Sequence, residues 1–287
     1  MKRFFLVLAT LFASVTLSYA QEYNDVVDKY EAATAAIGND NLEEALGLLK
    51  ETYALAITVE DAAEIAANCK STIPQIAYKI AAHYFTAKDW ATAATKLEEA
   101  IATADEYENE EYAVKAAELL PDAHYEAAKA LEETDLEAAK EALKALSEGG
   151  EARATSRLAF LTSKQATEMQ KEASALTDAA AKKAAFKKVY DLAQESLAYE
   201  ESATAYKTMA AAARVIEKYK EAITGYEKYL ELKPDAKDTI TIYNNMASCY
   251  EKLGNKAKAI EYYKIVAASD NEKLKEKAKK KVESLSK

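Results

Sequence analysis

The feature that most constrains this chain is an internal repeat near its C-terminal end. A block of small and aromatic side chains returns after 37 residues, in that Tyr206, Met209, Ala210, Ala222 and Tyr226 are followed by Tyr243, Met246, Ala247, Ala259 and Tyr263. Such a period predicts one supersecondary unit per block, and it predicts that neighbouring units stack to bury a shared core. A small residue at a fixed place in each block suits two helices that approach closely.

The last of these blocks resembles a tetratricopeptide repeat. In that family an aromatic residue, a small pair and a second aromatic residue mark the first helix, and a small residue with an aromatic residue four positions later marks the second. The matching residues here are Tyr243, Met246, Ala247, Tyr250, Gly254, Ala259 and Tyr263. The preceding block ends at Pro234, where the family usually has proline, but Ala213 replaces its first-helix tyrosine. The resemblance implies an all-α fold, a right-handed α-solenoid of stacked antiparallel helix pairs.

Weaker copies of the pattern precede these two blocks. They consist of Ala33 and Ala36 with Ala45 and Leu49, Ala81 and Tyr84 with Ala93 and Leu97, Ala127 and Ala130 with Ala139 and Leu143, and Ala173 and Leu176 with Ala185 and Val189. The second-helix alanines at 45, 93, 139, 185, 222 and 259 are separated by 48, 46, 46, 37 and 37 residues. The family period is 34, so we expect longer helices or connections in the first four units. We predict degenerate units over 21–200, two well-matched units over 201–273 and a capping helix over 274–287.

Composition and helix-breaking residues agree with an all-helical array. The chain has only 6 Gly and 3 Pro among 287 residues, and runs of β-branched residues with alternating polarity, which would indicate strands, are absent. Pro74 and Pro121 are expected at the start of first helices, and Pro234 in a connection. Gly254 is expected at a turn, whereas Gly47 and Gly225 are expected inside second helices, at sites of close contact.

Both ends of the chain have a distinct character. Lys2 and Arg3 precede an apolar run that closes at Ser18-Tyr19-Ala20, which predicts a cleavable signal peptide over 1–20 and export, with the periplasm preferred over release. The run is too short to span a bilayer, so integral membrane insertion is not expected. At the other end, the lysine-rich segment 271–287 places Leu274, Ala278, Val282 and Leu285 on one face. We expect this face to cover the last repeat, and the alternative is a docking tail for anionic surfaces.

The charge and the cysteines exclude several classes of function. A formal net charge of -10 disfavours nucleic acid as a partner. Cys69 and Cys249 would lie about four repeats apart, so a disulfide between them is not expected. We expect Cys249 to be buried and Cys69 to be accessible.

The sequence offers no set of residues that would support catalysis. There are two histidines, and no metal-binding His-Glu-x-x-His, glycine-rich phosphate loop or Gly-x-Ser-x-Gly turn is present. The acidic run from Asp105 to Glu111 lacks the spacing and the glycine of a calcium loop, so a solvated connection is the better interpretation. We therefore predict no enzyme activity, metal or cofactor.

The resemblance implies a binding surface on the first helices. At concave positions of that family this sequence has Gln75, Tyr78, Phe85, His124, Tyr125, Lys207, Arg214, Asn244, Asn245 and Ser248. Lys207 and Asn245 match two residues of a clamp that some relatives use for a peptide's terminal carboxylate. Ala211 stands where that clamp has asparagine, so we do not predict the clamp.

Three functions are compatible with these features. The first is an exported scaffold that binds a protein or peptide through the concave surface. The second is a structural or assembly factor of the cell envelope that self-associates or bridges components. The third is a carbohydrate-binding or helical-repeat enzyme, which would need Trp90 and acidic residues to converge in a pocket. The sequence identifies neither the partner nor the oligomeric state.

Overall fold

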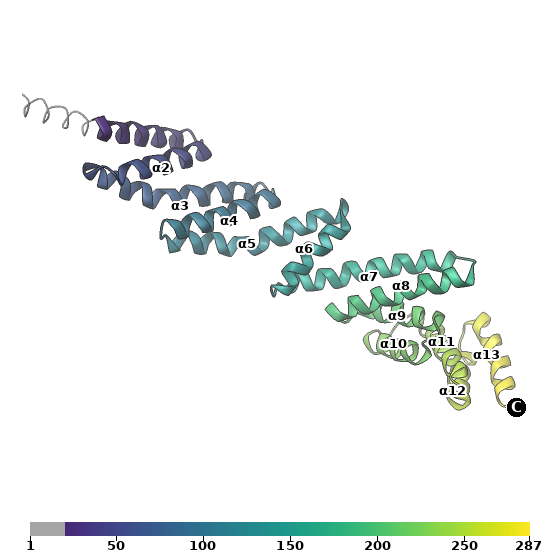
Figure 1. Ribbon diagram of the computed structural model, residues 1–287. Coiled ribbons are helices and arrows are strands. Elements are labelled where there is room, and N and C mark those ends of the chain that lie inside the picture. Colours follow the sequence, from purple (N-terminus) through teal and green to yellow (C-terminus); the bar gives the residue numbers. More distant parts are fainter. Residues whose placement is uncertain (1–20) are drawn as a thin grey trace, which may run out of the picture. The chain divides into compact units, whose positions relative to one another are not determined.

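The computed structural model describes residues 21–287 as helices joined by short turns (Figure 1). The predicted signal peptide at 1–20 lies outside the described residues. No strand occurs between residues 21 and 287. The predicted all-α class is therefore confirmed for the described chain.

The chain divides into two compact units, residues 1–139 and 140–287. The described part of the first unit begins with a helix over residues 21–38. It continues with α2 (Leu42–Ala56), a 3₁₀ turn (Glu60–Ala62), α3 (Ala63–Thr86), α4 (Trp90–Glu106), α5 (Glu110–Ala130) and a second 3₁₀ turn (Leu131–Glu133). Each of α2, α3 and α4 packs against the helix that follows it, and α3 also packs against α5.

The second unit begins within α6 (Leu136–Glu148). It continues with α7 (Ala152–Ala175), α8 (Ala179–Tyr199), α9 (Ala203–Val215), α10 (Tyr219–Leu232), α11 (Thr239–Lys252), α12 (Lys256–Ala267) and α13 (Glu272–Leu285). From α7 onward each helix packs against the next, so both units are arrays of stacked antiparallel helices. The solenoid arrangement predicted from the repeats is confirmed within each unit.

One turn geometry recurs between successive helices and explains how the chain reverses. A residue with positive φ follows the helix, and the next N–H bonds to a carbonyl five residues earlier, as in a Schellman C-cap. These bonds run from Asn41 to Ala36, Asp89 to Tyr84, Asn109 to Ala104, Glu151 to Leu146, Lys218 to Ala213 and Asn255 to Tyr250, at 2.8–3.1 Å. The positive-φ residues are Asp40, Lys88, Glu108, Gly150, Glu217 and Gly254. The turn predicted at Gly254 is therefore confirmed.

Most of the predicted repeat-packing residues are buried. The second-helix alanines Ala45, Ala93, Ala139, Ala222 and Ala259 are completely inaccessible, as are the first-helix residues Ala81, Ala210 and Ala247. The aromatic residues Tyr226 and Tyr263 are buried, and Tyr84, Tyr243 and Tyr250 are half-buried against the core clusters. The repeat pattern thus identifies the residues where helices meet.

Two of the weaker units need a corrected register. Ala185 is only half-buried, and Phe186 takes the buried position in α8. In α5 it is Ala128 that is buried, whereas Ala127 is half-buried and Ala130 is exposed. Both segments are rich in alanine, so several registers of the sequence pattern were equivalent. Leu176 is also not a helix residue, because it is the exposed C-cap of α7.

The expected positions of two prolines are wrong. Pro74 and Pro121 lie in the interior of α3 and α5, eleven residues after each helix begins. A proline there leaves the carbonyl four residues earlier without its helical donor. The apolar face of α3 continues on both sides of Pro74, with Cys69, Ile73 and Ile76 buried, and this packing carries the helix through the proline. Pro234 lies in the α10–α11 connection, as predicted.

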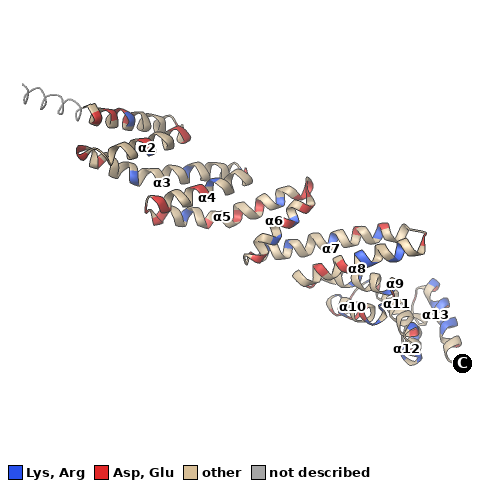
Figure 2. Ribbon diagram, viewed as in Figure 1, with Lys and Arg blue, Asp and Glu red and all other residues tan. Residues whose placement is uncertain are grey.

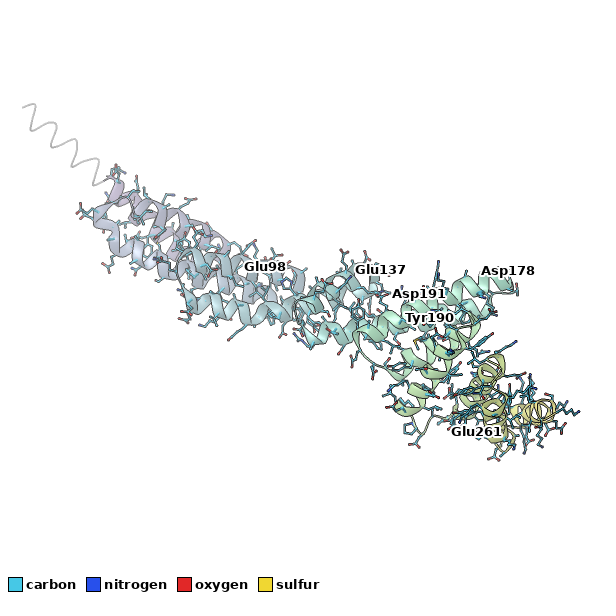
Figure 3. The ribbon with its side chains drawn as sticks, turned by 60° about the horizontal axis from the view of Figure 1, so that its bottom comes forward. Glu98, Glu137, Asp178, Tyr190, Asp191 and Glu261 are labelled. Atoms are coloured by element: carbon cyan, nitrogen blue, oxygen red, sulfur yellow. The ribbon has the colours of Figure 1, made fainter. Side chains whose placement is uncertain are left out.

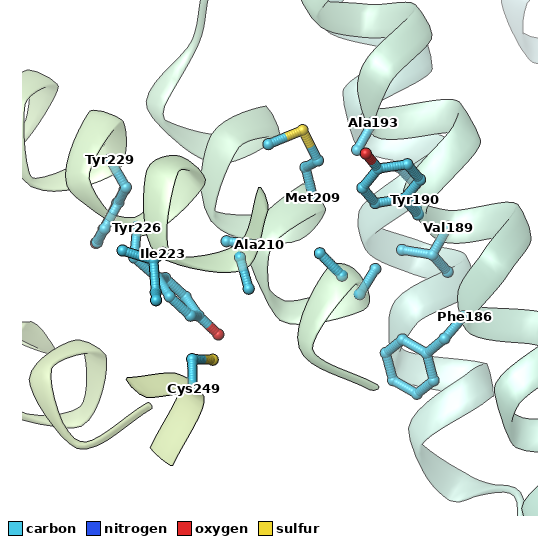
Figure 4. Packing of buried hydrophobic residues seen from close by; sticks show 14 of the residues in the cluster. Phe186, Val189, Tyr190, Ala193, Met209, Ala210, Ile223, Tyr226, Tyr229 and Cys249 are labelled. Atoms are coloured by element: carbon cyan, nitrogen blue, oxygen red, sulfur yellow. The ribbon is translucent and has the colours of Figure 1, made fainter. Parts of the chain in front are cut away.

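The core of the second unit is continuous from α7 to α11. Figure 4 shows Phe186 and Tyr190 of α8, Met209 of α9, Tyr226 of α10 and Cys249 of α11 as parts of one cluster. A second cluster joins α11, α12 and α13, and Ala278 of α13 is completely buried in it. Leu274, Val282 and Leu285 pack against the same cluster. The helix α13 therefore caps the array, as the sequence predicted.

Two kinds of feature are absent from residues 21–287. None of the helices between residues 21 and 287 combines the length and apolar character that crossing a membrane requires. Within the same residues no three or more His, Cys, Asp and Glu side chains gather in a way that could hold a metal ion.

Candidate interaction surface

The first group of candidate residues surrounds Asp238, the N-cap residue of α11. Lys207 Nζ of α9 lies 2.6 Å from Asp238 Oδ2, and the Tyr229 hydroxyl of α10 donates to Asp238 Oδ1 at 2.7 Å. The Lys207 ammonium also lies 5.2 Å from the centre of the Tyr229 ring. Burial acts to raise the pKa of Asp238, but the hydrogen bonds from Lys207 and Tyr229 outweigh it and lower the pKa. Three helices are thus joined by one polar network.

The second group lies around the buried Tyr226 ring. Asn245 Nδ2 of α11 donates to the Tyr226 hydroxyl at 3.3 Å, and Arg214 of α9 is a further hydrogen-bond partner of that hydroxyl. Burial raises the pKa of Tyr226, and the positive charge of Arg214 opposes the shift. Arg214 is itself half-buried, and its Nε is buried without a hydrogen-bond partner within residues 21–287. Arg214 therefore holds a buried donor without an acceptor in the described chain.

The third group connects α11 to the capping helix. Glu251 of α11 accepts from the Tyr263 hydroxyl at 2.9 Å and from Lys281 Nζ of α13 at 2.7 Å. Ser248 is a further hydrogen-bond partner of Tyr263, whose pKa is raised, chiefly by burial. Asn244 is half-buried on the same helix. The sequence pattern did not single out Asp238, Tyr229, Glu251 or Lys281 as partners, because they contact the candidates across helices rather than along one.

The candidates in the first unit are held by aromatic contacts. Tyr78 of α3 lies against Tyr112 of α5, with ring centres 5.7 Å apart, and Phe85 lies edge-on to Trp90 at 5.3 Å. His124 Nε2 of α5 is 3.2 Å from Glu98 Oε1 of α4, and the Lys129 ammonium lies 5.3 Å from the Tyr125 ring centre. Gln75 is half-buried on α3.

These positions divide the candidates into two sets. Gln75, Tyr78, Phe85, His124 and Tyr125 belong to the first unit, and the other five candidates belong to the second. Trp90 is half-buried against Phe85 rather than displayed in a pocket, so the arrangement expected for a carbohydrate site is not found around it.

A groove in the first unit was not anticipated. It has a volume of about 540 Å³ and lies between the second helices α2 and α4, with Ala77 and Ile80 of α3 among its lining residues. Leu46 and Gly47 line it from α2, and Lys96 from α4. Gly47 is exposed there, and a Cβ added to it would meet no neighbour within 4 Å, so the expected close contact at Gly47 is wrong. The sequence signal available for this groove was Gly47, a glycine inside a helix, and it lies on an open surface rather than at a close contact.

Comparison with known proteins relates part of the chain to a family. Residues 201–268 match the family model described as "Tetratricopeptide repeat". No curated protein matches the chain. Among solved structures, the TPR2AB domain of yeast Sti1 in a complex with pHSP90 is similar over 92% of this chain and 99% of its own, with 15% identity and a TM-score of 0.41. A thermophilic TPR protein of Thermus thermophilus is similar over 73% of this chain and 98% of its own, with 15% identity and a TM-score of 0.31.

Proposed function

Residues 201–268 match the tetratricopeptide-repeat family model, and from this premise we propose that the protein is an exported, non-catalytic scaffold that binds a protein or peptide segment through α9 and α11. Stacked helical repeats present extended surfaces suited to such partners. The proposed contact residues are Lys207, Arg214, Asn244, Asn245 and Ser248.

The observation that carries this proposal is the Arg214 side chain. A buried donor without an acceptor is costly, so it favours a bound state in which the half-buried Arg214 side chain turns toward the partner and its Nε gains an acceptor oxygen. Asn245 and Arg214 are both hydrogen-bond partners of the Tyr226 hydroxyl, so the buried Tyr226 side chain brings the two donors together. Donors that are already oriented lose less entropy when a partner binds.

The same contacts indicate what the partner offers at this surface. Lys207 is already neutralised by Asp238 at 2.6 Å, and Ala211 supplies no side-chain amide. A free terminal carboxylate would therefore lack the lysine and asparagine donors of the clamp. A chain segment with backbone or side-chain carbonyl oxygens suits Arg214 and Asn245 better. We therefore propose recognition of an internal segment of the partner rather than its C-terminus.

Photo-crosslinking in native cells tests this surface. We expect a photoreactive amino acid at Asn244 to capture a discrete protein, whereas the same group at exposed Glu227 of α10 should not. Arg214→Ala and Asn245→Ala should each abolish the product while the protein keeps its natural helix content, and Lys220→Ala should retain the product. A product that survives both substitutions, or an equal product from position 227, would show that this surface is not the binding site.

Export and the lack of catalysis are separate parts of the proposal. The charged start and apolar run of residues 1–20 support cleavage after Ala20, and the intact mass of the protein recovered from the periplasm should then begin at Gln21. Recovery of the full-length chain in the cytoplasm would refute export. The absence of metal-binding and nucleophile motifs from the sequence supports a non-catalytic role.

A further inference from the structure

The two units carry opposite net charges. Residues 21–139 have 26 acidic and 8 basic side chains, which gives -18, whereas residues 140–287 have 22 acidic and 28 basic side chains, which gives +6. Figure 2 shows acidic residues at the turns of the first unit and basic residues along α8 and α13 of the second. The overall charge of -10 conceals this separation. Oppositely charged surfaces attract at long range and select partners.

The second unit contains an apolar groove with a basic rim. The groove has a volume of about 440 Å³ and lies between α8 and the α9–α10 turn. Ala180 and Ala184 leave space along α8, and Tyr190 and Ile216 add apolar surface. Figure 3 shows Tyr190 beside Asp191, the one acidic residue of the lining.

Three lysines line the groove, and only one of them forms an ion pair within residues 21–287. Lys183 pairs with Glu217 at 3.1 Å, and the Lys218 ammonium lies 4.1 Å from the Tyr190 ring centre. Lys187 is exposed. The groove therefore suits an apolar side chain that is surrounded by carboxylates.

The first unit presents such a side chain at Ile57, the C-cap of α2. Ile57 is 60% exposed, more than any other large apolar residue of the described chain. Glu60, Asp61 and Glu64 follow it and are all exposed, and no Lys or Arg occurs between Glu51 and Glu64. Residues 57–64 are called the acidic knob below.

More carboxylates lie close to the acidic knob. Tyr53, one helical turn before Ile57, packs against Tyr107 of the α4–α5 turn, with ring centres 5.2 Å apart. The last residues of α4 and that turn carry Asp105, Glu106 and Glu108, all of them exposed. Lys70 pairs with Glu108 and offsets one of these charges.

We propose that the protein associates with itself head to tail, with the acidic knob of one copy docked in the basic-rimmed groove of the next. This self-association goes beyond the proposed function and does not rest on it, because it uses residues 57–64 and the groove between α8 and the α9–α10 turn rather than the residues of α9 and α11 around Arg214. The two surfaces are different patches of one chain, so the contact is heterologous and leaves a free knob and a free groove at the ends of each assembly. The result is a chain of copies rather than a closed dimer.

The charges favour Ile57 over Phe160 and Ile265, two exposed apolar residues of the second unit. Phe160 is 55% exposed, but its surroundings carry both signs of charge, because it contacts Arg157 and lines a pocket together with Lys164, Glu200 and Glu201. Ile265 is 41% exposed and follows Lys264. The α2–α4 groove is a poorer receptor for the knob, because Glu43 and Glu99 line it together with Lys50 and Lys96.

Sedimentation velocity of the purified chain over a range of concentrations tests the association. At low ionic strength we expect the weight-average sedimentation coefficient to rise with concentration, and we expect added salt to reduce the rise. Ile57→Ser should weaken the association by about tenfold or more, because it removes the apolar anchor. Ile265→Ser, a matched change at a site outside the contact, should leave the association unchanged.

A mixing experiment distinguishes the heterologous contact from general charge attraction. The knob variant carries Glu60→Lys and Asp61→Lys, and the groove variant carries Lys183→Glu and Lys187→Glu. Each should be monomeric alone, whereas an equimolar mixture should form a 1:1 dimer and nothing larger, because one intact knob and one intact groove remain. A control variant with Lys237→Glu and Lys256→Glu, two exposed lysines outside the groove, should associate like the natural chain.

Three outcomes would overturn the proposal. They are a natural chain that stays monomeric at all concentrations and low salt, a groove variant that associates as well as the natural chain, and a mixture that remains monomeric while both variants keep the natural helix content and melting temperature. Binding of the partner through Arg214 is measured separately, so either idea can fail alone.

Discussion

Gly225 of α10 faces Ala210 of α9 so closely that a Cβ on the glycine would lie 2.9 Å from the alanine Cβ. The same atom would lie 2.9 Å from Met209 Cε and 3.2 Å from the Tyr206 carbonyl oxygen. The predicted close contact at Gly225 is therefore confirmed. Helices α9 and α10 can approach this closely because position 225 has no side chain.

We expect Gly225→Ala to destabilise the second unit by about 1–2 kcal/mol, since forced separation of the helices outweighs the gain in helix propensity. Gly47→Ala, at the open glycine of α2, should instead stabilise the first unit by about 0.5–1 kcal/mol. Hydrogen exchange of the flanking helices measures both effects locally. Equal effects at the two glycines would contradict the close contact.

Lys88 has a φ of 61° in the turn between α3 and α4. A left-handed conformation costs an L-residue about 1–2 kcal/mol, and glycine avoids most of that cost. We therefore expect Lys88→Gly to stabilise the first unit by about 0.5–1 kcal/mol. The control Lys79→Gly, within α3, should destabilise it by about 1 kcal/mol. Thermal unfolding of the two variants beside the natural chain checks the opposite signs.

Glu251 makes the stability of the capping helix depend on pH. Burial acts to raise its pKa, but the hydrogen bonds from Lys281 and Tyr263 prevail, and the pKa lies below the ordinary value of 4.5. Because the folded pKa is the lower one, the contribution is complete above pH 4.5 and is lost as the pH falls from there through the folded pKa. Hydrogen exchange of α13 should accelerate over that range.

Substitution of Glu251 isolates this contribution. Glu251→Gln should weaken α13 by about 1–2 kcal/mol at neutral pH and should remove most of the acid dependence. Glu261→Gln changes an exposed carboxylate that pairs only along α12 with Lys258, and it should have little effect. An acid dependence that persists in Glu251→Gln would assign it to another group.

Cys69 is completely buried, so the expected accessibility of this thiol is wrong. It packs with Ile73, Ile76 and Tyr107 in the core of the first unit, and burial raises its pKa to about 11. Burial likewise raises the pKa of Cys249 to about 11, with a smaller opposing effect of Arg214. Both cysteines are free thiols.

We expect both thiols to react with Ellman's reagent at pH 8 roughly two orders of magnitude more slowly than an exposed thiol, and rapidly in denaturant. Ser71→Cys, at an exposed position of α3, supplies the fast reference. Native labelling of Cys69 at the rate of this reference would show that the α4–α5 turn opens readily.

Much of the fold could be predicted because its signals are local. The alanines at 222, 247 and 259 lie where helices meet, and none of them has another alanine directly beside it, so the repeat pattern fixes the register there. In α5 and α8 neighbouring alanines offered several registers, and only the packing partners selected Ala128 and Phe186.

The candidate site was predicted less completely than the fold. The first-helix positions of α9 and α11 followed from the repeat, but their partners did not. Asp238 and Glu251 contact residues that are distant in sequence, and such contacts leave no periodic signal. The same is true of the two grooves, which form between helices.

The sequence by itself determined the helical class, the repeat, the capping helix and the turn at Gly254, since helix periodicity and small residues act over a few positions. Only the tertiary structure decided that α3 and α5 continue through Pro74 and Pro121, that Cys69 is buried and that Arg214 holds a donor without an acceptor among residues 21–287. It also placed Ile57 at an exposed helix end and the lysines of α8 around a groove. The physical reason is that burial and electrostatics depend on which helices meet, and that is settled by the packing of the whole unit.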